Sequence, residues 1–278
     1  MQNEVVVSNA LDNMRAHAYN PGQDKWREIA PLVREDLPEV DSWRTQWLGF
    51  STTLGSAGGH LVVLGGGDAM RPEPLQKRMD VYDPAQDTWS RLPDLPFHNH
   101  SNRIVEVDGK AWCFGGTLRP NATADAPLDF GTLDIGATFI YDPATRTWTD
   151  GPRLPHGLSE PGYYGNNPPC GFELRNQLCV MGAFEVGLHR FRSVAFMWDA
   201  TRETWDPFPA PPVVAHAVSQ TDEHVVAHGS FPSEEPIDGT TPTPTRLFVL
   251  DQGSRDWVEW DIGDARRSGT RYGAVRIG

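Results

Sequence analysis

Histidine is the residue of this 278-residue chain best suited to proton transfer near neutral pH, and two copies stand close together. His98 and His100 are two positions apart, so in an extended strand both imidazoles would share one face. We predict that His100 and the more distant His216 act as catalytic acid and base. The alternative is a divalent metal held by His98, His100, His216 and His228, although a histidine pair specifies a ligand set only loosely.

Aromatic, amide and guanidinium side chains accompany these histidines along the chain. We predict that Tyr164 and Arg271 polarise or orient a bound molecule beside the two catalytic histidines. The predicted ligand-binding residues are Arg44, Trp47, His98, Asn102, Tyr163, Asn167, Arg267 and Tyr272. Such groups form a site for a polar ligand only if they converge on one hollow. Their convergence depends on the elements that carry them and on strand register.

An eight-residue unit that recurs five times indicates what those elements are. Each unit begins with an aromatic residue or Leu followed by Asp or Asn, and each ends in Trp. The five units end at Trp26, Trp89, Trp148, Trp205 and Trp257, spaced 52 to 63 residues apart. This period is typical of a repeat array. We expect the tryptophans to pack between neighbouring repeats rather than to bind a ligand.

Each unit has the signals of a β-hairpin. In the copy 82–89 the sequence Tyr-Asp-Pro-Ala-Gln-Asp-Thr-Trp places an Asp side chain and a proline-fixed φ at the turn. Apolar runs that end in small residues precede three units, at 61–67, 111–116 and 178–183, and a further short apolar strand lies upstream. Four short antiparallel strands per repeat predict the blade of a β-propeller.

A Gly-Gly pair followed by Tyr and then Trp makes the chain similar to the kelch-repeat family, whose blades also build the galactose-oxidase-like propellers. Gly65-Gly66, Tyr82 and Trp89 carry this resemblance in one repeat, and the next repeat follows the same order. The resemblance covers nearly the whole chain. It implies a propeller fold but leaves the activity open, because one fold hosts many unrelated functions.

Counting the units predicts an all-β fold, a five-bladed kelch-type propeller, as a single domain over residues 1–278. Four blades end near Trp89, Trp148, Trp205 and Trp257. The segment 1–30 supplies only part of a blade, and we expect residues 268–278 to complete it. Pairing of the last strand with the first strands would close the ring and remove exposed sheet edges.

Strand order also predicts the face that holds the site. The turns between third and fourth strands are tight, whereas the loops between second and third strands and the connections between blades are long. The long second-to-third loops are predicted at 66–78, 116–136, 183–192 and 229–246. Long loops in a compact domain often carry function. We therefore expect the histidines and tyrosines named above at the mouth of the central channel on this face.

The composition restricts the partners and the compartment. The formal net charge is −13 and no Lys/Arg-rich run occurs, so we expect no nucleic acid partner. No apolar run approaches the roughly 20 residues of a membrane span, and no leader is recognised, so we expect a cytoplasmic protein without membrane contact. Cys113, Cys170 and Cys179 are expected to be free thiols.

Two functions remain after these exclusions. Nothing in the sequence suggests nicotinamide, flavin, haem or ATP, so we expect a cofactor-independent isomerase, cyclase or lyase that acts on a small polar or aromatic molecule. The alternative is a protein–protein interaction scaffold, which the kelch resemblance implies most often. Such scaffolds usually carry an additional domain, and its absence from this chain favours the enzyme.

Overall fold

The computed structural model describes most of the repeat array. The described residues are 4–8, 16–20, 22–32, 53–65, 77–96, 102–115, 136–158, 169–187, 190–221, 224–232, 246–260 and 273–277. They form strands and turns, and no α-helix occurs among them. Accordingly, no helix within these ranges has the length and hydropathy needed to span a membrane.

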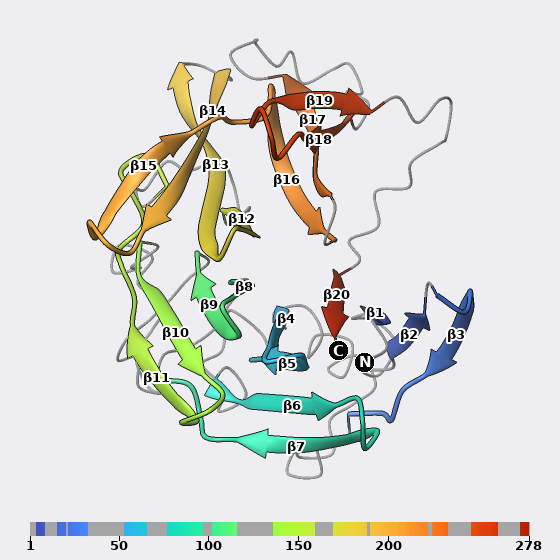
Figure 1. The fold of residues 1–278 in the computed structure, drawn as a ribbon. Helices are drawn as coiled ribbons and strands as arrows, with labels where there is room; N and C mark the ends of the chain where they lie inside the picture. Colours follow the sequence, from blue (N-terminus) through green and yellow to red (C-terminus); the bar gives the residue numbers. More distant parts are fainter. Residues whose placement is uncertain are drawn as a thin grey trace, which may run out of the picture. The chain divides into compact units, whose positions relative to one another are not determined.

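The strands pair into five four-stranded sheets (Figure 1). The first sheet comprises β1 (Glu4–Ser8), β2 (Ala16–Asn20), β3 (Lys25–Glu28) and β20 (Gly273–Ile277). The second comprises β4 (Thr53–Ala57), β5 (His60–Leu64), β6 (Met79–Asp83) and β7 (Thr88–Leu92). The third comprises β8 (Arg103–Val107), β9 (Lys110–Phe114), β10 (Thr138–Asp142) and β11 (Thr147–Asp150).

The last two sheets contain the longest strands. The fourth sheet comprises β12 (Cys170–Leu174), β13 (Gln177–Gly187), β14 (Arg190–Asp199) and β15 (Thr204–Phe208). The fifth comprises β16 (Val213–Gln220), β17 (Val225–Pro232), β18 (Arg246–Leu250) and β19 (Trp257–Trp260). Each sheet is an antiparallel meander, the strand arrangement of a propeller blade.

The chain divides into two compact units. The N-terminal unit comprises Met1–Asp134, Phe139–Asp150 and Thr270–Gly278, and the C-terminal unit comprises Ile135–Thr138 and Gly151–Gly269. The first two sheets and nearly all of the third lie in the N-terminal unit, and the fourth and fifth lie in the C-terminal unit. The single-domain prediction stays a prediction.

The predicted pairing of the two chain ends is confirmed within the N-terminal unit. β20 pairs antiparallel with β1 from Glu4↔Ile277 to Ser8↔Gly273. β20 also packs against β4 and β5 of the second sheet. The last strand therefore completes the sheet that the first residues of the chain begin.

The predicted hairpin turns are confirmed, and the side chain of the Asp, or of Asn20 in the first repeat, accepts a backbone hydrogen bond in each of them. Asp83 Oδ1 accepts hydrogen bonds from the backbone N–H groups of Ala85 (2.8 Å) and Gln86 (3.3 Å). The same bond is made by Asp142, Asp199 and Asp251 in the later repeats. The residue four positions after this Asp or Asn has a positive φ of 51° to 65° in all five repeats, at Asp24, Asp87, Arg146, Glu203 and Arg255.

The motif tryptophans join neighbouring sheets, as predicted, in both units. The indole Nε1–H of Trp89 donates to the carbonyl O of Ala30 at 2.6 Å, and that of Trp257 donates to Pro209 at 2.9 Å. Both acceptors lie just after the outer strand of the preceding sheet. For Trp26 the packing stays a prediction, because the first sheet has no preceding sheet within its own unit, where this side chain is 59% exposed.

In each unit, buried apolar side chains pack between neighbouring sheets. In the C-terminal unit Phe172, Cys179, Phe208 and Leu250 belong to one buried cluster that spans the fourth and fifth sheets. In the N-terminal unit β4 packs on β8 so closely that a Cβ on Gly55 would lie 2.3 Å from Cβ of Ile104. Only glycine fits that approach. The three cysteines are buried free thiols, as predicted.

One predicted loop is a pair of strands. Residues 183–192 were expected to form a loop, but β13 continues to Gly187 and β14 begins at Arg190. The β13–β14 ladder extends from Cys179↔Met197 to Gly187↔Arg190, so backbone pairing leaves two residues between the strands. Part of the loop predicted at 229–246 is likewise strand, because β17 continues to Pro232.

Candidate functional site

Most of the predicted site lies outside the described residues. This holds for Arg44, Trp47, His98, His100, Tyr163, Tyr164, Asn167, Arg267, Arg271 and Tyr272. Their convergence on one channel mouth stays a prediction. The structure describes the backbone of His216 and the side chains of Asn102 and His228.

Asn102 lies at the junction of the second and third sheets. Its side chain is buried, and its backbone carbonyl accepts a hydrogen bond from Thr53 Oγ1 of β4 at 3.1 Å. Burial raises the pKa of the neighbouring Cys113 thiol to about 12, and a hydrogen bond with the Asn102 side chain partly offsets this effect. Asn102 therefore helps to hold two sheets together, and its role in binding a ligand stays a prediction.

His216 occupies an irregular place in the β16–β17 ladder. Val214 pairs with Phe231, but the next pairs are Ala215↔Gly229 and Ala217↔His228, so His216 and Ser230 have no place in the ladder. A Cβ on Gly229 would lie 2.1 Å from the carbonyl O of Val214, so glycine permits this close approach. Such irregularities redirect side chains and occur often next to active sites. The signal that sequence reasoning missed is the glycine inside a strand.

The metal alternative remains untested. His228 lies in β17, where it pairs with Leu247 of β18, and its side chain is half-buried. No three His, Cys, Asp or Glu side chains in the described ranges are placed to hold a metal ion. His98 and His100 lie outside those ranges.

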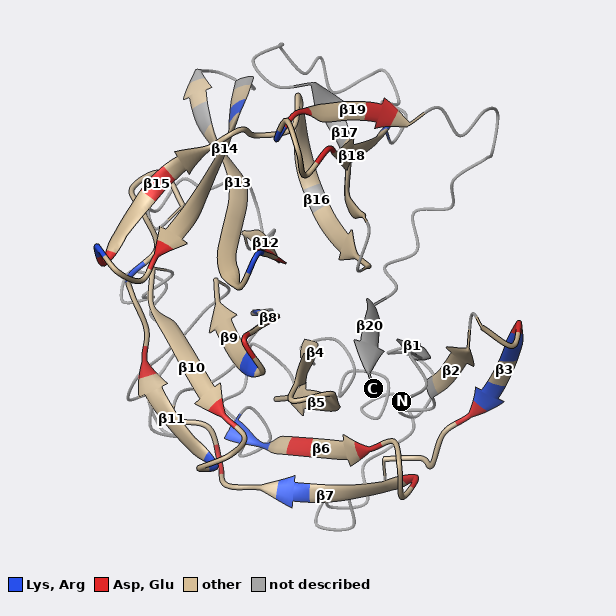
Figure 2. Ribbon diagram, in the orientation of Figure 1, with Lys and Arg blue, Asp and Glu red and all other residues tan. Residues whose placement is uncertain are grey.

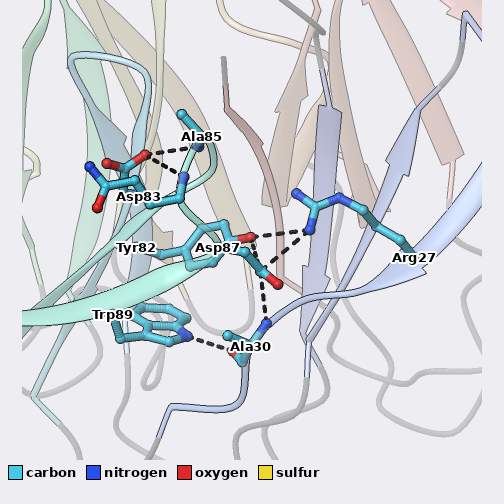
Figure 3. A network of polar contacts seen from close by, with 8 residues as sticks. Arg27, Ala30, Tyr82, Asp83, Ala85, Asp87 and Trp89 are labelled. Carbon is cyan, nitrogen blue, oxygen red and sulfur yellow. Dashed lines mark hydrogen bonds and ion pairs between the residues drawn. The ribbon is translucent and has the colours of Figure 1, made fainter.

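A polar network between the first and second sheets was not predicted (Figure 3). The Tyr82 hydroxyl donates to Asp87 Oδ1 at 2.5 Å, and the Ala30 N–H donates to the same oxygen at 3.0 Å. Arg27 Nη1 of β3 lies 3.2 Å from the Tyr82 hydroxyl and 3.5 Å from Asp87 Oδ1. The hydrogen bond from Tyr82, then that from Ala30, lowers the pKa of Asp87. Burial and the hydrogen bond to Asp87 raise the pKa of Tyr82 to about 12.

Two arginines mark the ends of long second-to-third connections. Arg78 precedes β6 and donates from Nε to both carboxylate oxygens of Asp80 at 2.9 Å, and both side chains are buried. Arg246, at the corresponding position before Leu250, donates to both oxygens of Glu259 at 2.8 and 2.7 Å. An Arg four residues before the first residue of the motif is the signal that sequence reasoning overlooked.

Within the C-terminal unit, the β13–β14 hairpin projects beyond both neighbouring strands. β13 pairs with β12 only as far as Met181, and β14 pairs with β15 only from Ala195 onwards. We call the remaining ribbon, residues 182–187 and 190–194, the arm. Val186 is an extra residue in its ladder, between the pairs Glu185↔Phe191 and Gly187↔Arg190. It is 41% exposed.

Both faces of the arm are fixed near its base. Ala183 and Phe191 are buried with Val214 of β16 in one apolar cluster, and Ser193 Oγ donates to the Val213 carbonyl at 2.7 Å. On the other face the ring of Phe184 packs beside Gly157, where an added Cβ would lie 3.5 Å from the ring. The arm is therefore a supported element rather than a free loop.

Charged side chains are spread over the sheets rather than gathered. Figure 2 shows acidic positions on β6 and a basic position on β7, with both kinds on β3. In the fourth sheet Arg202 bonds Asp199 and Asp206. Arg202 thus pairs within one sheet, whereas Arg27 and Asp87 pair between two sheets.

The comparisons with known proteins agree with the sheet architecture. Residues 50–96 match the Kelch motif family model. The chain is 28% identical over 189 residues to the kelch-like protein terF of Aspergillus terreus. The matched stretch covers 65% of this chain and 37% of that protein. It is 31% identical over 111 residues to an F-box/kelch-repeat protein of Arabidopsis thaliana, covering 36% and 22% of the two chains.

A third relative gives the same family at lower identity. Kelch-like protein 35 of Mus musculus is 23% identical over 168 residues, covering 58% of this chain and 23% of that protein. The chain thus spans well under half the length of these relatives. The fold and the repeated motif define a β-propeller of kelch blades. The chain carries a Kelch motif and is similar to kelch-repeat proteins.

Proposed function

We propose that the chain is a protein-binding module whose partner docks on the face of the second-to-third-strand connections. The observation that carries this proposal is the arm, the one described second-to-third connection that is regular β-structure almost to its tip. Its base is packed on both faces, so binding would not have to order it first. Protein interaction is also the use that the kelch resemblance implies most often.

Affinity capture with matched variants tests this proposal. The full chain and the double variant Val186→Asp/Arg192→Glu would be used in parallel to capture proteins from a lysate of the source organism. We expect one partner in near-stoichiometric amount with the parent chain and at least tenfold less with the variant. Val258→Asp, which changes an exposed valine of β19, is the control. Equal capture by all three chains, or no stoichiometric partner, would contradict the proposal.

A second candidate is a cofactor-independent enzyme, an isomerase, cyclase or lyase for a small polar or aromatic molecule. The irregular ladder at His216 favours it, because a displaced residue on an inner strand is suited to present its side chain to a ligand. In this proposal His100 and His216 transfer protons, and Tyr164 and Arg271 orient the ligand. A divalent metal remains the alternative for the histidines, and a cytoplasmic location stays a prediction.

Ligand-induced stabilisation tests the enzyme proposal. A panel of small polar and aromatic metabolites would be screened for a rise in Tm of the parent chain, and each hit compared with His100→Ala and His216→Ala. We expect the rise to be lost, and turnover of the hit to fall at least a hundredfold, in both variants. A hit that stabilises and turns over equally in all three chains would exclude these histidines.

We also propose that the five sheets are the blades of one closed five-bladed propeller. The burial of the residue three positions after the motif Trp supports this closed ring. Ile29, Leu92 and Phe208 are buried there in other sheets, whereas Trp260 in the fifth sheet is 53% exposed. A closed ring would bury this large apolar side chain as it buries the others.

A further inference from the structure

Among the described residues, β13 has an edge along the arm that no strand pairs with. In the ranges that the structure describes, no strand pairs with residues 182–187 on the side where β12 ends. An edge of this kind presents a row of backbone N–H and C=O groups that another strand can bind. At six residues it is as long as an ordinary strand, so a peptide could pair over its full length.

The charge of the arm differs from that of the chain. The chain carries a formal net charge of −13, whereas residues 182–194 hold Arg190 and Arg192 against the single acidic Glu185. Arg192 is exposed on the same face as its cross-strand neighbour Phe184. The net negative charge of the chain disfavours an acidic segment, and the arm is a place where the local charge is of the opposite sign.

The bulge at Val186 adds an apolar contact. Val186 is the extra residue of the ladder, so its side chain does not follow the regular alternation of side chains between the two faces of the strand. It is exposed beside the edge. A side chain on an added strand can cover it. Backbone pairing would then supply affinity, and Val186 and Arg192 would select the sequence.

From these observations we infer that the arm binds an extended acidic segment of a partner protein, which adds to the edge of β13 as a further β-strand. The inference rests on the proposed protein-binding function and specifies the mode of recognition. Strand addition requires the partner segment to be unpaired before binding. A folded domain that docks through side chains alone would not form hydrogen bonds with the backbone N–H and C=O groups along this edge.

Peptide selection on the full chain tests the inference. A random twelve-residue peptide display library would be panned on the parent chain, and the affinity of selected peptides measured for it and for three variants. We expect enrichment of Asp and Glu among β-branched residues. Val186→Asp and Arg192→Glu should each weaken binding at least tenfold, and Val258→Asp less than twofold. All three changed residues are exposed, so the variants should fold.

Hydrogen exchange distinguishes strand addition from other docking. With a selected peptide bound, we expect protection of alternate amides within residues 182–187, because successive N–H groups of a strand point to opposite sides. Peptides that bind equally to both arm variants, or protection without a period of two, would overturn the inference. If the captured partner still depends on the long-loop face in that case, the protein-binding proposal stands and only the mode of recognition is wrong.

Discussion

Arg27 and Asp87 lie 60 positions apart in sequence, yet Nη1 of one is 3.5 Å from Oδ1 of the other. They connect the outer strand of the first sheet with the hairpin turn of the second. The Tyr82 hydroxyl lies between them, bonded to Asp87 Oδ1 at 2.5 Å. The contact joins two repeats through Asp87, the residue of the second-sheet turn that has a positive φ.

Loss of the Asp87 carboxylate should weaken the contact between the first two sheets. Asp87→Asn is expected to lower the free energy of unfolding by about 1 kcal/mol, a modest value because half of the side chain is exposed. The folded-state pKa of Asp87 is lowered, so its contribution is present above the unfolded pKa of about 3.9 and is lost as pH falls through the folded value. Urea unfolding at pH 7 and pH 3 checks this, and the difference between parent and variant should shrink at pH 3.

Ionisation of Tyr82 should destabilise the protein in alkali. Its folded pKa is raised to about 12, whereas an unfolded tyrosine ionises near about 10. The stabilisation is therefore complete below about pH 10 and is lost as pH rises towards 12. In Tyr82→Phe the Tm should fall less steeply between pH 9 and pH 11 than in the parent chain. Parallel curves for the two chains would contradict the assignment.

A glycine in the turn between β12 and β13 should increase the stability of the protein. Arg175 and Asn176 both have positive φ, 55° and 62°, as in a type I′ hairpin. Asn176→Gly is expected to raise the free energy of unfolding by up to about 1 kcal/mol. The matched control is Gly109→Asn at the same position of the β8–β9 turn, where φ is 72° and nothing lies within 4 Å of an added Cβ. This reverse change should be neutral or destabilising in thermal melts.

The close approach at Gly229 should not tolerate a methyl group. Gly229→Ala would place Cβ 2.1 Å from the Val214 carbonyl, so the β16–β17 ladder must open around His216. We expect a loss of about 2 kcal/mol or more in chemical unfolding. Gly109→Ala, which meets no neighbouring atom, should lose only about 1 kcal/mol from its backbone conformation. Equal losses would show that the approach at Gly229 is relaxed in solution.

The stability of the variant Trp260→Ser distinguishes a closed ring from an open array. If the ring closes, Trp260→Ser should reduce the free energy of unfolding by about 3 kcal/mol, as for a buried aromatic residue. If the side chain is as exposed as in the structure, the loss should stay within about 0.5 kcal/mol. Ser90→Ala, on the exposed part of β7, provides the surface reference.

The sequence by itself determined the repeat, its turns and the strands around them. An Asp or Asn side chain, followed by proline in the first three copies, and the aromatic and apolar residues around it lie within eight consecutive positions, so each hairpin can be predicted without its neighbours. The pairing of the first and last strands was also predictable, because the partial first repeat lacked one strand.

Tertiary structure decided the features that depend on residues far apart. Gly229 meets Val214 across two strands and displaces His216, and Arg27 meets a turn 60 residues away. The arm is held in place because Phe191 and Ala183 pack against Val214 of another sheet. Register and packing of this kind arise from contacts between repeats, and no pattern within one repeat specifies them.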